Sequence, residues 1–127
     1  MAAPSFQELA AERYVSLVTF RRNGIGVPTP IWIAPDDGKL YAVTDGTSAK
    51  MKRLRVTDRI RIAACDARGN VKGEWAEGRA RRVDDLAVVA RAMAALERKY
   101  GWQFAALNWF SRLVGRIGRR AYIEITT

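Results

Sequence analysis

The feature that most constrains this chain is a strand-like run followed at once by a tight-turn signal. The run Tyr14–Phe20 is dense in β-branched and aromatic residues, which favour strands. Asn23-Gly24 then suits the positive φ angles of a hairpin turn. A partner strand over roughly 26–34 is therefore expected to pair antiparallel with the first. Because Pro28 and Pro30 cannot donate ladder hydrogen bonds, this strand is expected to start at an edge, at a bulge, or where something other than a strand approaches.

Two helices have clear boundary signals. Ser5 and Glu8 form a capping-box pattern, which predicts a short helix to about Ala11. A longer helix is expected to begin after Asp84 or Asp85 and to end at Gly101. Its apolar face is predicted from residues that recur at spacings of three and four: Leu86, Val89, Ala90, Met93 and Leu96.

Further strands are expected over 39–44, 59–65, 74–83 and 122–126, with a shorter helix within 104–113. In the strand 59–65, Arg59 and Arg61 fall on one face and Ile60 and Ile62 on the other. Five or six antiparallel strands with helices after the third and fifth predict a mainly β fold with helical additions (α+β). We expect a small β-barrel in which residues 1–127 form a single domain.

The segment 44–55 combines groups that favour a bound phosphate. After a turn at Asp45-Gly46, Thr47 and Ser48 are candidate N-caps of a short helix. Three cations (Lys50, Lys52 and Arg53) follow at once. Free helix N–H groups, the helix dipole and cationic side chains together attract a phosphate. A solvated basic surface helix is the alternative interpretation, because the glycines of a P-loop and of the dinucleotide fingerprint are missing.

Composition limits the functions that remain. The net charge of +9 favours anionic partners. Because the chain has no histidine and one cysteine, Cys65, it has no Ser-His-Asp or Cys-His catalysis, no usual zinc site and no internal disulfide. Cys65 lies in an apolar run and is expected to be a buried thiol. No apolar run is long enough to span a membrane and residues 1–4 do not resemble a signal peptide, so we expect a cytoplasmic protein without a membrane span.

The order and spacing of several runs resemble those of a known family. These runs are Tyr14–Phe20, Val27-Pro28-Thr29-Pro30-Ile31-Trp32, Leu40-Tyr41-Ala42-Val43-Thr44, Lys50-Met51-Lys52-Arg53-Leu54-Arg55, Arg59-Ile60-Arg61-Ile62-Ala63 and Gly78-Arg79-Ala80-Arg81. Together they are similar to the split β-barrel flavin-binding family related to pyridoxamine 5′-phosphate oxidase, and in particular to its deazaflavin (coenzyme F420) dependent reductase branch. The resemblance covers nearly the whole chain and weakens after Tyr100.

The resemblance implies a homodimer with the cofactor in a groove between subunits. The backbone of Thr29, Pro30, Ile31 and Trp32 would lie against the isoalloxazine-like ring. The phosphate and ribityl chain would be held by Thr44, Ser48, Lys50, Lys52 and Arg53. Arg55, with the basic residues Arg116, Arg119 and Arg120, would meet the charges of a polyglutamate tail.

The chemistry implied by the resemblance is hydride transfer between the reduced deazaflavin C5 and a small unsaturated or carbonyl-like substrate. The cofactor supplies the reactivity, so no catalytic side chain is expected. Water, Tyr41 or a lysine could donate a proton. FMN is the alternative cofactor, because it shares the phosphate, the ribityl chain and the ring shape. The aromatic stretch 102–110 is expected either to cover an apolar substrate or to pack in the core.

Three other functions remain open. The same barrel could hold a flavin, deazaflavin or haem without turning it over. Nucleic-acid binding is suggested by the net charge and by the arginines at 53, 55, 59, 61, 79, 81 and 82, but no recognition motif accompanies them. Attachment to a membrane surface would use Trp109, Phe110, Leu113 and Val114 together with Arg112 and Arg116.

Overall fold

Turn chemistry and side-chain period divide the chain into strands and helices in the computed structural model, which describes residues 3–113 and 120–127. Asp85 caps the longest helix by accepting hydrogen bonds from the N–H groups of Ala87 and Val88. In chain order the elements are α1 (Phe6–Ala10), β1 (Tyr14–Phe20), β2 (Gly26–Ile31), β3 (Ile33–Asp36), β4 (Lys39–Asp45), α2 (Ala49–Val56), β5 (Arg59–Cys65), β6 (Ala76–Val83), α3 (Leu86–Tyr100), α4 (Trp102–Leu113) and β7 (Arg120–Thr126).

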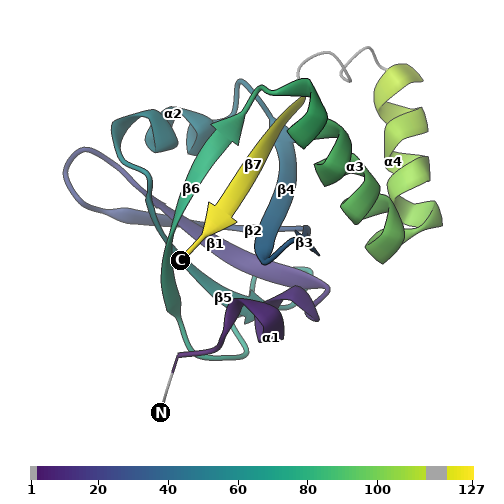
Figure 1. Ribbon diagram of the computed structural model, residues 1–127. Coiled ribbons are helices and arrows are strands. Elements are labelled where there is room, and N and C mark those ends of the chain that lie inside the picture. Colours follow the sequence, from purple (N-terminus) through teal and green to yellow (C-terminus); the bar gives the residue numbers. More distant parts are fainter. Residues whose placement is uncertain (1–2, 114–119) are drawn as a thin grey trace.

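The strands form one sheet in the order β2-β1-β5-β6-β7-β4-β3, and each neighbouring pair is antiparallel. β2 and β3 lie at opposite ends of this order, although Trp32 alone separates them in the chain. The sheet therefore curls until its end strands meet at Trp32, and the ribbon in Figure 1 follows this curl. The result is a split β-barrel.

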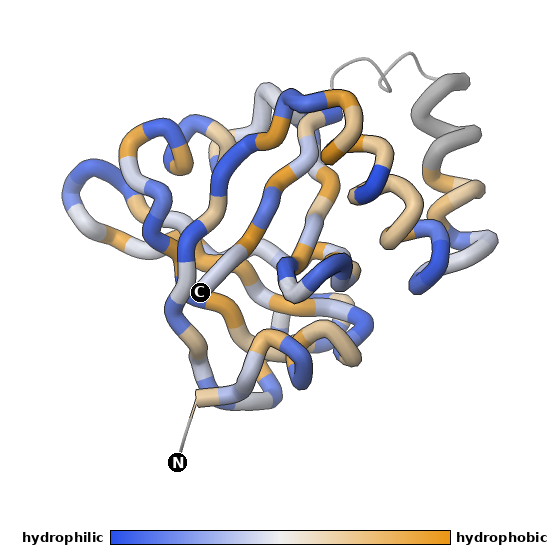
Figure 2. Tube along the Cα trace, in the orientation of Figure 1, coloured by the Kyte–Doolittle hydropathy of each residue, from blue (hydrophilic) through white to orange (hydrophobic). Residues whose placement is uncertain are grey.

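Two hydrophobic clusters occupy the two faces of the curled sheet. The inner cluster includes Leu17, Ile60, Ile62 and Ile123, all fully buried. The outer cluster lies where α3 packs on β3 and β4, and α4 packs in turn on α3. Figure 1 shows these two helices beside the sheet, and Figure 2 shows the hydrophobic segments along the strands. Five consecutive residues are buried in β1 and in β7, so these two strands are covered on both faces.

The helix α2 joins two parts of the barrel. The turn before it is closed by Asp45, whose carboxylate accepts from Thr47 N–H (2.8 Å) and from the Thr47 hydroxyl (2.6 Å). α2 then packs on β1 and β6 through Met51, which is buried, and Leu54. Residues 48–50, between the Asp45 turn and Met51, therefore lie at the end of β4, next to β1.

The predicted mainly β fold with helical additions is confirmed, and β1 and β5 have the predicted bounds. The first hairpin is also confirmed. Arg21 N–H donates to the Ile25 carbonyl (2.9 Å), and Gly24 takes a φ of +87°. Cys65 is buried as predicted, and burial raises the pKa of its thiol. Arg59 and Arg61 are exposed while Ile60 and Ile62 are buried.

Three details differ from the sequence prediction. The predicted strand 26–34 is broken at Trp32, so the described residues form seven strands rather than five or six. Ser48 occupies the N-cap position of α2, but its hydroxyl makes no cap hydrogen bond. The predicted apolar face of α3 is confirmed in part, because Val89, Met93 and Leu96 pack in the outer cluster. Leu86 is 85% exposed and Ala90 is exposed, whereas Ala92, Ala95 and Tyr100 are buried with Leu96.

Candidate functional site

A groove of about 250 Å³ opens where β2 passes into β3 beside the end of β4. It contains five of the residues that the sequence singles out: Pro30, Ile31, Trp32, Thr44 and Lys50. The other lining residues are Tyr14, Val43, Ala67 and Leu107. The groove thus has an apolar and aromatic wall on one side and a cation on the other.

The cationic end of the groove is built by α2 against the barrel. Lys50 lines the groove, whereas Ser48 at the N-cap of α2 and Arg53 on the same helix do not line it. Lys50 Nζ donates to the Thr44 hydroxyl at 2.7 Å, and Arg53 Nε donates to the Thr19 hydroxyl at 2.6 Å. Lys50 and Arg53 stand three residues apart on α2, hence on one helix face. Both are partly buried. Hydroxyl groups from β4 and β1 therefore hold two like charges close together.

These two charges are incompletely compensated. Burial and the neighbouring Arg53 lower the pKa of Lys50, while Asp45 acts in the opposite direction. Burial, followed by the charge of Arg21, lowers the pKa of Arg53. Within residues 3–113 and 120–127, neither side chain forms an ion pair with a carboxylate. A bound anion would supply the missing countercharge.

Ser48 gives an independent indication of a ligand at the start of α2. Its Oγ is buried and has no hydrogen-bond partner in the described part of the chain. Buried hydroxyls are nearly always paired, so this one calls for a partner. Ser48, Lys50 and Arg53 together fit a phosphate group, with the N-terminus of α2 adding favourable dipole charge.

The remaining predicted site residues lie apart from this end of the groove. Lys52 and Arg55 are exposed on the side of α2 that faces away from the barrel core. Thr29 pairs with Leu17, so its side chain shares the inner face of the sheet. Arg120 lies over the ring of Phe104 at 5.8 Å, and Arg116 and Arg119 lie outside the described residues.

The aromatic wall depends on residues that the sequence reasoning missed. The Trp32 and Tyr100 rings stack with centroids 4.4 Å apart and an interplanar angle of 8°. The Tyr100 hydroxyl accepts from Ile33 N–H (3.1 Å) and donates to the Arg13 carbonyl (2.8 Å). Lys99 Nζ donates to the Ile33 carbonyl (2.7 Å). No local signal marks these contacts, because α3 lies far along the chain from Trp32. Thr19 and Tyr14 were also missed, because the residues that they meet at the site lie far from them in the sequence.

Tyr41 is not placed as a proton donor to the groove. It is 2% exposed, and its hydroxyl donates to Glu124 Oε2 at 3.1 Å within the outer cluster. Glu124 is itself buried and also accepts from Arg81 Nε at 3.2 Å. Burial, followed by the Glu124 hydrogen bond, raises the pKa of Tyr41. This tyrosine therefore secures the sheet under α3.

The aromatic stretch 102–110 divides between core and surface. Phe104 is fully buried in the outer cluster, whereas Trp102 is 78% exposed. Leu107, on the same helix, borders the groove. The side chains of Trp109 and Phe110, like most of the segment suggested for membrane attachment, lie outside the described residues. Core packing accounts for Phe104, and Leu107 is the described residue of α4 that reaches the groove.

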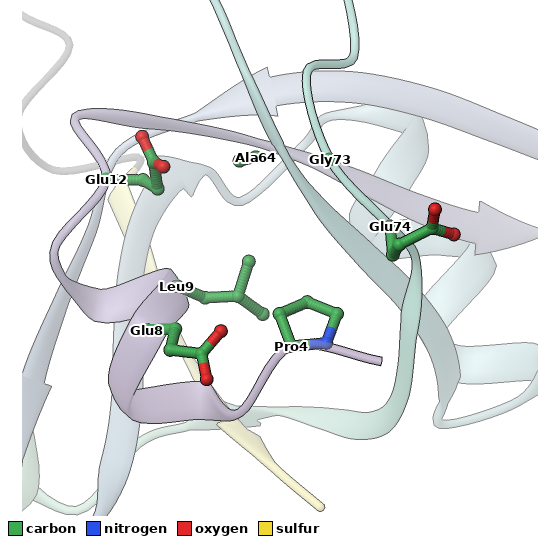
Figure 3. Close-up of a pocket in the computed structure, with 7 residues that line it drawn as sticks. All are labelled: Pro4, Glu8, Leu9, Glu12, Ala64, Gly73 and Glu74. Atoms are coloured by element: carbon green, nitrogen blue, oxygen red, sulfur yellow. The ribbon is translucent and has the colours of Figure 1, made fainter. Parts of the chain in front are cut away.

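A second pocket, of about 260 Å³, differs in chemistry. Figure 3 shows Glu8, Glu12 and Glu74 around it, with Leu9 and Pro4 at its base. Its acidic rim is unsuited to a phosphate. Within the described part of the chain, no group of three or more His, Cys, Asp or Glu side chains could hold a metal ion. None of the described helices is long and apolar enough to cross a membrane.

Solved structures share this fold at low sequence identity. A conserved hypothetical protein from Mycobacterium tuberculosis matches with a TM-score of 0.70 and 20% identity, over 94% of this chain and 75% of its own. The haem storage protein HutZ from Vibrio cholerae matches with a TM-score of 0.69 and 10% identity, over 91% and 82% of the two chains. A FAD-binding protein from Mesorhizobium loti matches with a TM-score of 0.57 and 19% identity, over 95% and 83%.

No curated protein matches the chain in sequence. A family model does match, and its span of residues 4–127 takes in β1 to β7 and the whole groove. By this match, the chain belongs to the pyridoxamine 5′-phosphate oxidase family.

Proposed function

We propose that this protein is an F420-dependent oxidoreductase that transfers a hydride to or from a small unsaturated or carbonyl-like substrate, with FMN as the alternative cofactor. The observation that carries the proposal is the cationic end of the groove. There, Lys50 and Arg53 are held by threonine hydroxyls without a carboxylate partner among the described residues, and the unpaired Ser48 hydroxyl lies at the start of the same helix. A ring system with a phosphorylated side chain matches both halves of the site.

The chain would act mainly by binding and orientation. Lys50, Arg53 and Ser48 would hold the phosphate, and Thr44 would keep Lys50 directed toward it. The wall formed by Pro30, Ile31 and Trp32 would carry the ring. When bound, the reduced deazaflavin supplies a hydride from C5. Because the groove is open to solvent, water would supply the proton that completes reduction of the substrate.

We also propose that the functional unit is a homodimer. The groove lies beside β2, an end strand of the sheet that pairs with β1 on one side. Pro28 and Pro30 alternate with the residues of β2 that can donate to β1, so the outer edge lacks these donors. A second copy could therefore cover the ring through side chains, without extending the sheet.

A non-catalytic binding protein on the same barrel is the second candidate. It is favoured by the structural similarity to a haem storage protein. Haem is the less suitable ligand for this chain, because histidine, a common axial ligand, is absent from its sequence and Cys65 is buried. A flavin or deazaflavin carrier differs from an enzyme only in turnover. Oxidation of reduced F420 by added electron acceptors, followed by absorbance, distinguishes the two.

Alanine variants on one helix test the binding proposal. Lys50→Ala and Arg53→Ala should each weaken F420 and FMN by about ten- to hundredfold, since each removes a charge-assisted contact. Lys52→Ala loses the same charge from the exposed side of α2 and serves as the matched control, with an effect of at most about threefold. Titration by fluorescence gives the affinities, and circular dichroism verifies the fold. Equal affinities in all four proteins would refute the site.

A further inference from the structure

Trp32 occupies a special place in the sheet. It is the single residue between β2 and β3, and it belongs to neither the β1–β2 nor the β3–β4 register. No ladder hydrogen bonds therefore fix its orientation. Its side chain is partly buried and lines the groove. Something outside the sheet must hold the indole if it is to form a fixed wall.

The C-terminus of α3 provides that support. Tyr100 is 3% exposed, and its ring lies parallel to the Trp32 indole at a centroid distance of 4.4 Å. Its hydroxyl bridges the break, since it accepts from Ile33 N–H and donates to the Arg13 carbonyl. Lys99 Nζ adds hydrogen bonds to the carbonyls of Ile33 and Glu12. The helix ends immediately afterwards at Gly101, with a φ of +57°.

These contacts act on one side of the groove only. The nearest polar anchors on the other side, the Lys50–Thr44 and Arg53–Thr19 hydrogen bonds, involve β4, α2 and β1. The aromatic wall and the cationic end are thus supported by different elements. A change in one support should alter affinity for one part of a ligand and leave the other part unchanged.

We propose that Tyr100 is a positioning residue that fixes Trp32 as the wall for a planar heteroaromatic ring, and so determines ring affinity independently of phosphate affinity. This inference rests on the proposed function, because the ring is that of the flavin or deazaflavin. An indole already held in place does not lose rotamer freedom when the ring binds, and that saving appears as affinity. Tyr100 acts through Trp32 and Ile33 and does not itself line the groove.

Three ligands separate the two ends of the site. FMN carries the ring and the phosphate, riboflavin carries the ring without the phosphate, and ribose 5-phosphate carries the phosphate without the ring. Tyr100→Leu removes both the stack and the hydroxyl, and should weaken FMN and riboflavin by about three- to tenfold. Ribose 5-phosphate should bind this variant as it binds the wild type. Tyr100→Phe keeps the ring but loses the hydroxyl. Its affinities for FMN and riboflavin should lie between those of the wild type and those of Tyr100→Leu.

Val89→Ala is the matched control. Val89 lies on the same helix and packs on the same outer cluster, but it makes no stacking contact with Trp32. Its affinities for all three ligands should equal those of the wild type. A loss of ribose 5-phosphate binding in Tyr100→Leu equal to the loss of FMN binding would overturn the inference. So would unchanged riboflavin and FMN affinities in that variant.

A ligand-free measurement keeps the inference separate from the proposed function. The indole N–H resonance of Trp32 can be identified by its absence in Trp32→Phe. Tyr100→Leu should move this resonance, because the stacked ring and its ring current are lost, whereas Val89→Ala should leave it in place. If the wild type binds none of the ligands nor F420, the proposed function fails. An unmoved Trp32 resonance would then overturn the positioning role, and a moved one would support it.

Discussion

The hydroxyl of Thr19 controls where the charge of Arg53 lies. Thr19 is fully buried in β1, where a polar side chain must find a partner or destabilise the strand. It accepts a hydrogen bond from Arg53 Nε at 2.6 Å. That bond uses the Nε–H of the guanidinium and leaves its terminal nitrogens for a ligand. One threonine thus links a central strand to the cationic end of the groove.

Thr19→Val should reduce cofactor affinity without removing any charge. Valine has nearly the shape of threonine, so the strand should remain, but Arg53 loses its acceptor and its preferred orientation. We expect F420 and FMN to bind about three- to tenfold more weakly. Thr19→Ser keeps the hydroxyl and should bind them as the wild type does. In an Arg53→Ala background the effect of Thr19→Val should vanish. A full effect in that background would show that Thr19 acts by another route.

At the scale of elements, the sequence predicted those strand bounds that depend on residues close together in the chain. β1 and β5 have the predicted bounds because their β-branched residues and flanking turns suffice to define them. The break at Trp32 was missed because the contact that accompanies it, the hydrogen bond from Ile33 N–H to the Tyr100 hydroxyl, spans 67 positions of sequence. A run such as Ile31-Trp32-Ile33 gives no local sign of that contact.

The buried face of α3 was likewise predicted only in part from the sequence. Leu86 fits the apolar period, but it lies in the first turn of the helix and is 85% exposed. Ala92 and Ala95 are buried instead, because small side chains let the helix approach the sheet closely. Hydropathy ranks leucine above alanine, so the sequence prediction included Leu86 and left out Ala92 and Ala95, while Val89, Met93 and Leu96 do pack as predicted. For the candidate site, the cations were predicted from their spacing after the turn and Thr44 from the family resemblance, whereas their hydroxyl and aromatic supports required the fold.

The contacts of α3 also predict a dependence of stability on pH. Burial, followed by the charge of Arg13, lowers the pKa of Lys99 from 10.5 to about 8. Between these two values the unfolded chain binds more protons at this site than the folded chain, so the free energy of unfolding should rise with pH. Below about pH 8 the lysine is protonated in both states and contributes no slope.

Lys99→Gln isolates this contribution. Glutamine can still donate to the Ile33 carbonyl but does not titrate. The stability of the wild type relative to Lys99→Gln should therefore increase between about pH 8 and about pH 10.5, as measured by urea unfolding. Burial raises the pKa of Tyr100 to about 12, but both proteins share that residue, so its effect cancels. Parallel pH profiles for the two proteins would contradict the assignment of Lys99.

At the scale of the whole molecule, the net charge of +9 favours every anion, so charge alone cannot identify the cofactor. Position can. Arg55 is exposed in the last turn of α2, the helix that also carries Lys50, and in the proposed complex it would meet the anionic tail. Lys39 lies at the other end of β4 from Thr44, close to Glu124 at 3.7 Å. These two residues allow the same charge to be removed from the helix that carries Lys50 and from a site away from that helix.

Arg55→Gln should weaken F420 by about two- to threefold and leave FMN unchanged, because FMN has no tail to meet this charge. Lys39→Gln lowers the net charge by the same amount and should change neither affinity. Raising NaCl from about 50 to about 500 mM should abolish the effect of Arg55→Gln, since an exposed ion pair is screened. If both variants weakened both cofactors equally, the whole-molecule field would be responsible. A selective loss of F420 in Arg55→Gln alone would assign the surplus charge next to α2 to a tail, and would favour F420 over FMN.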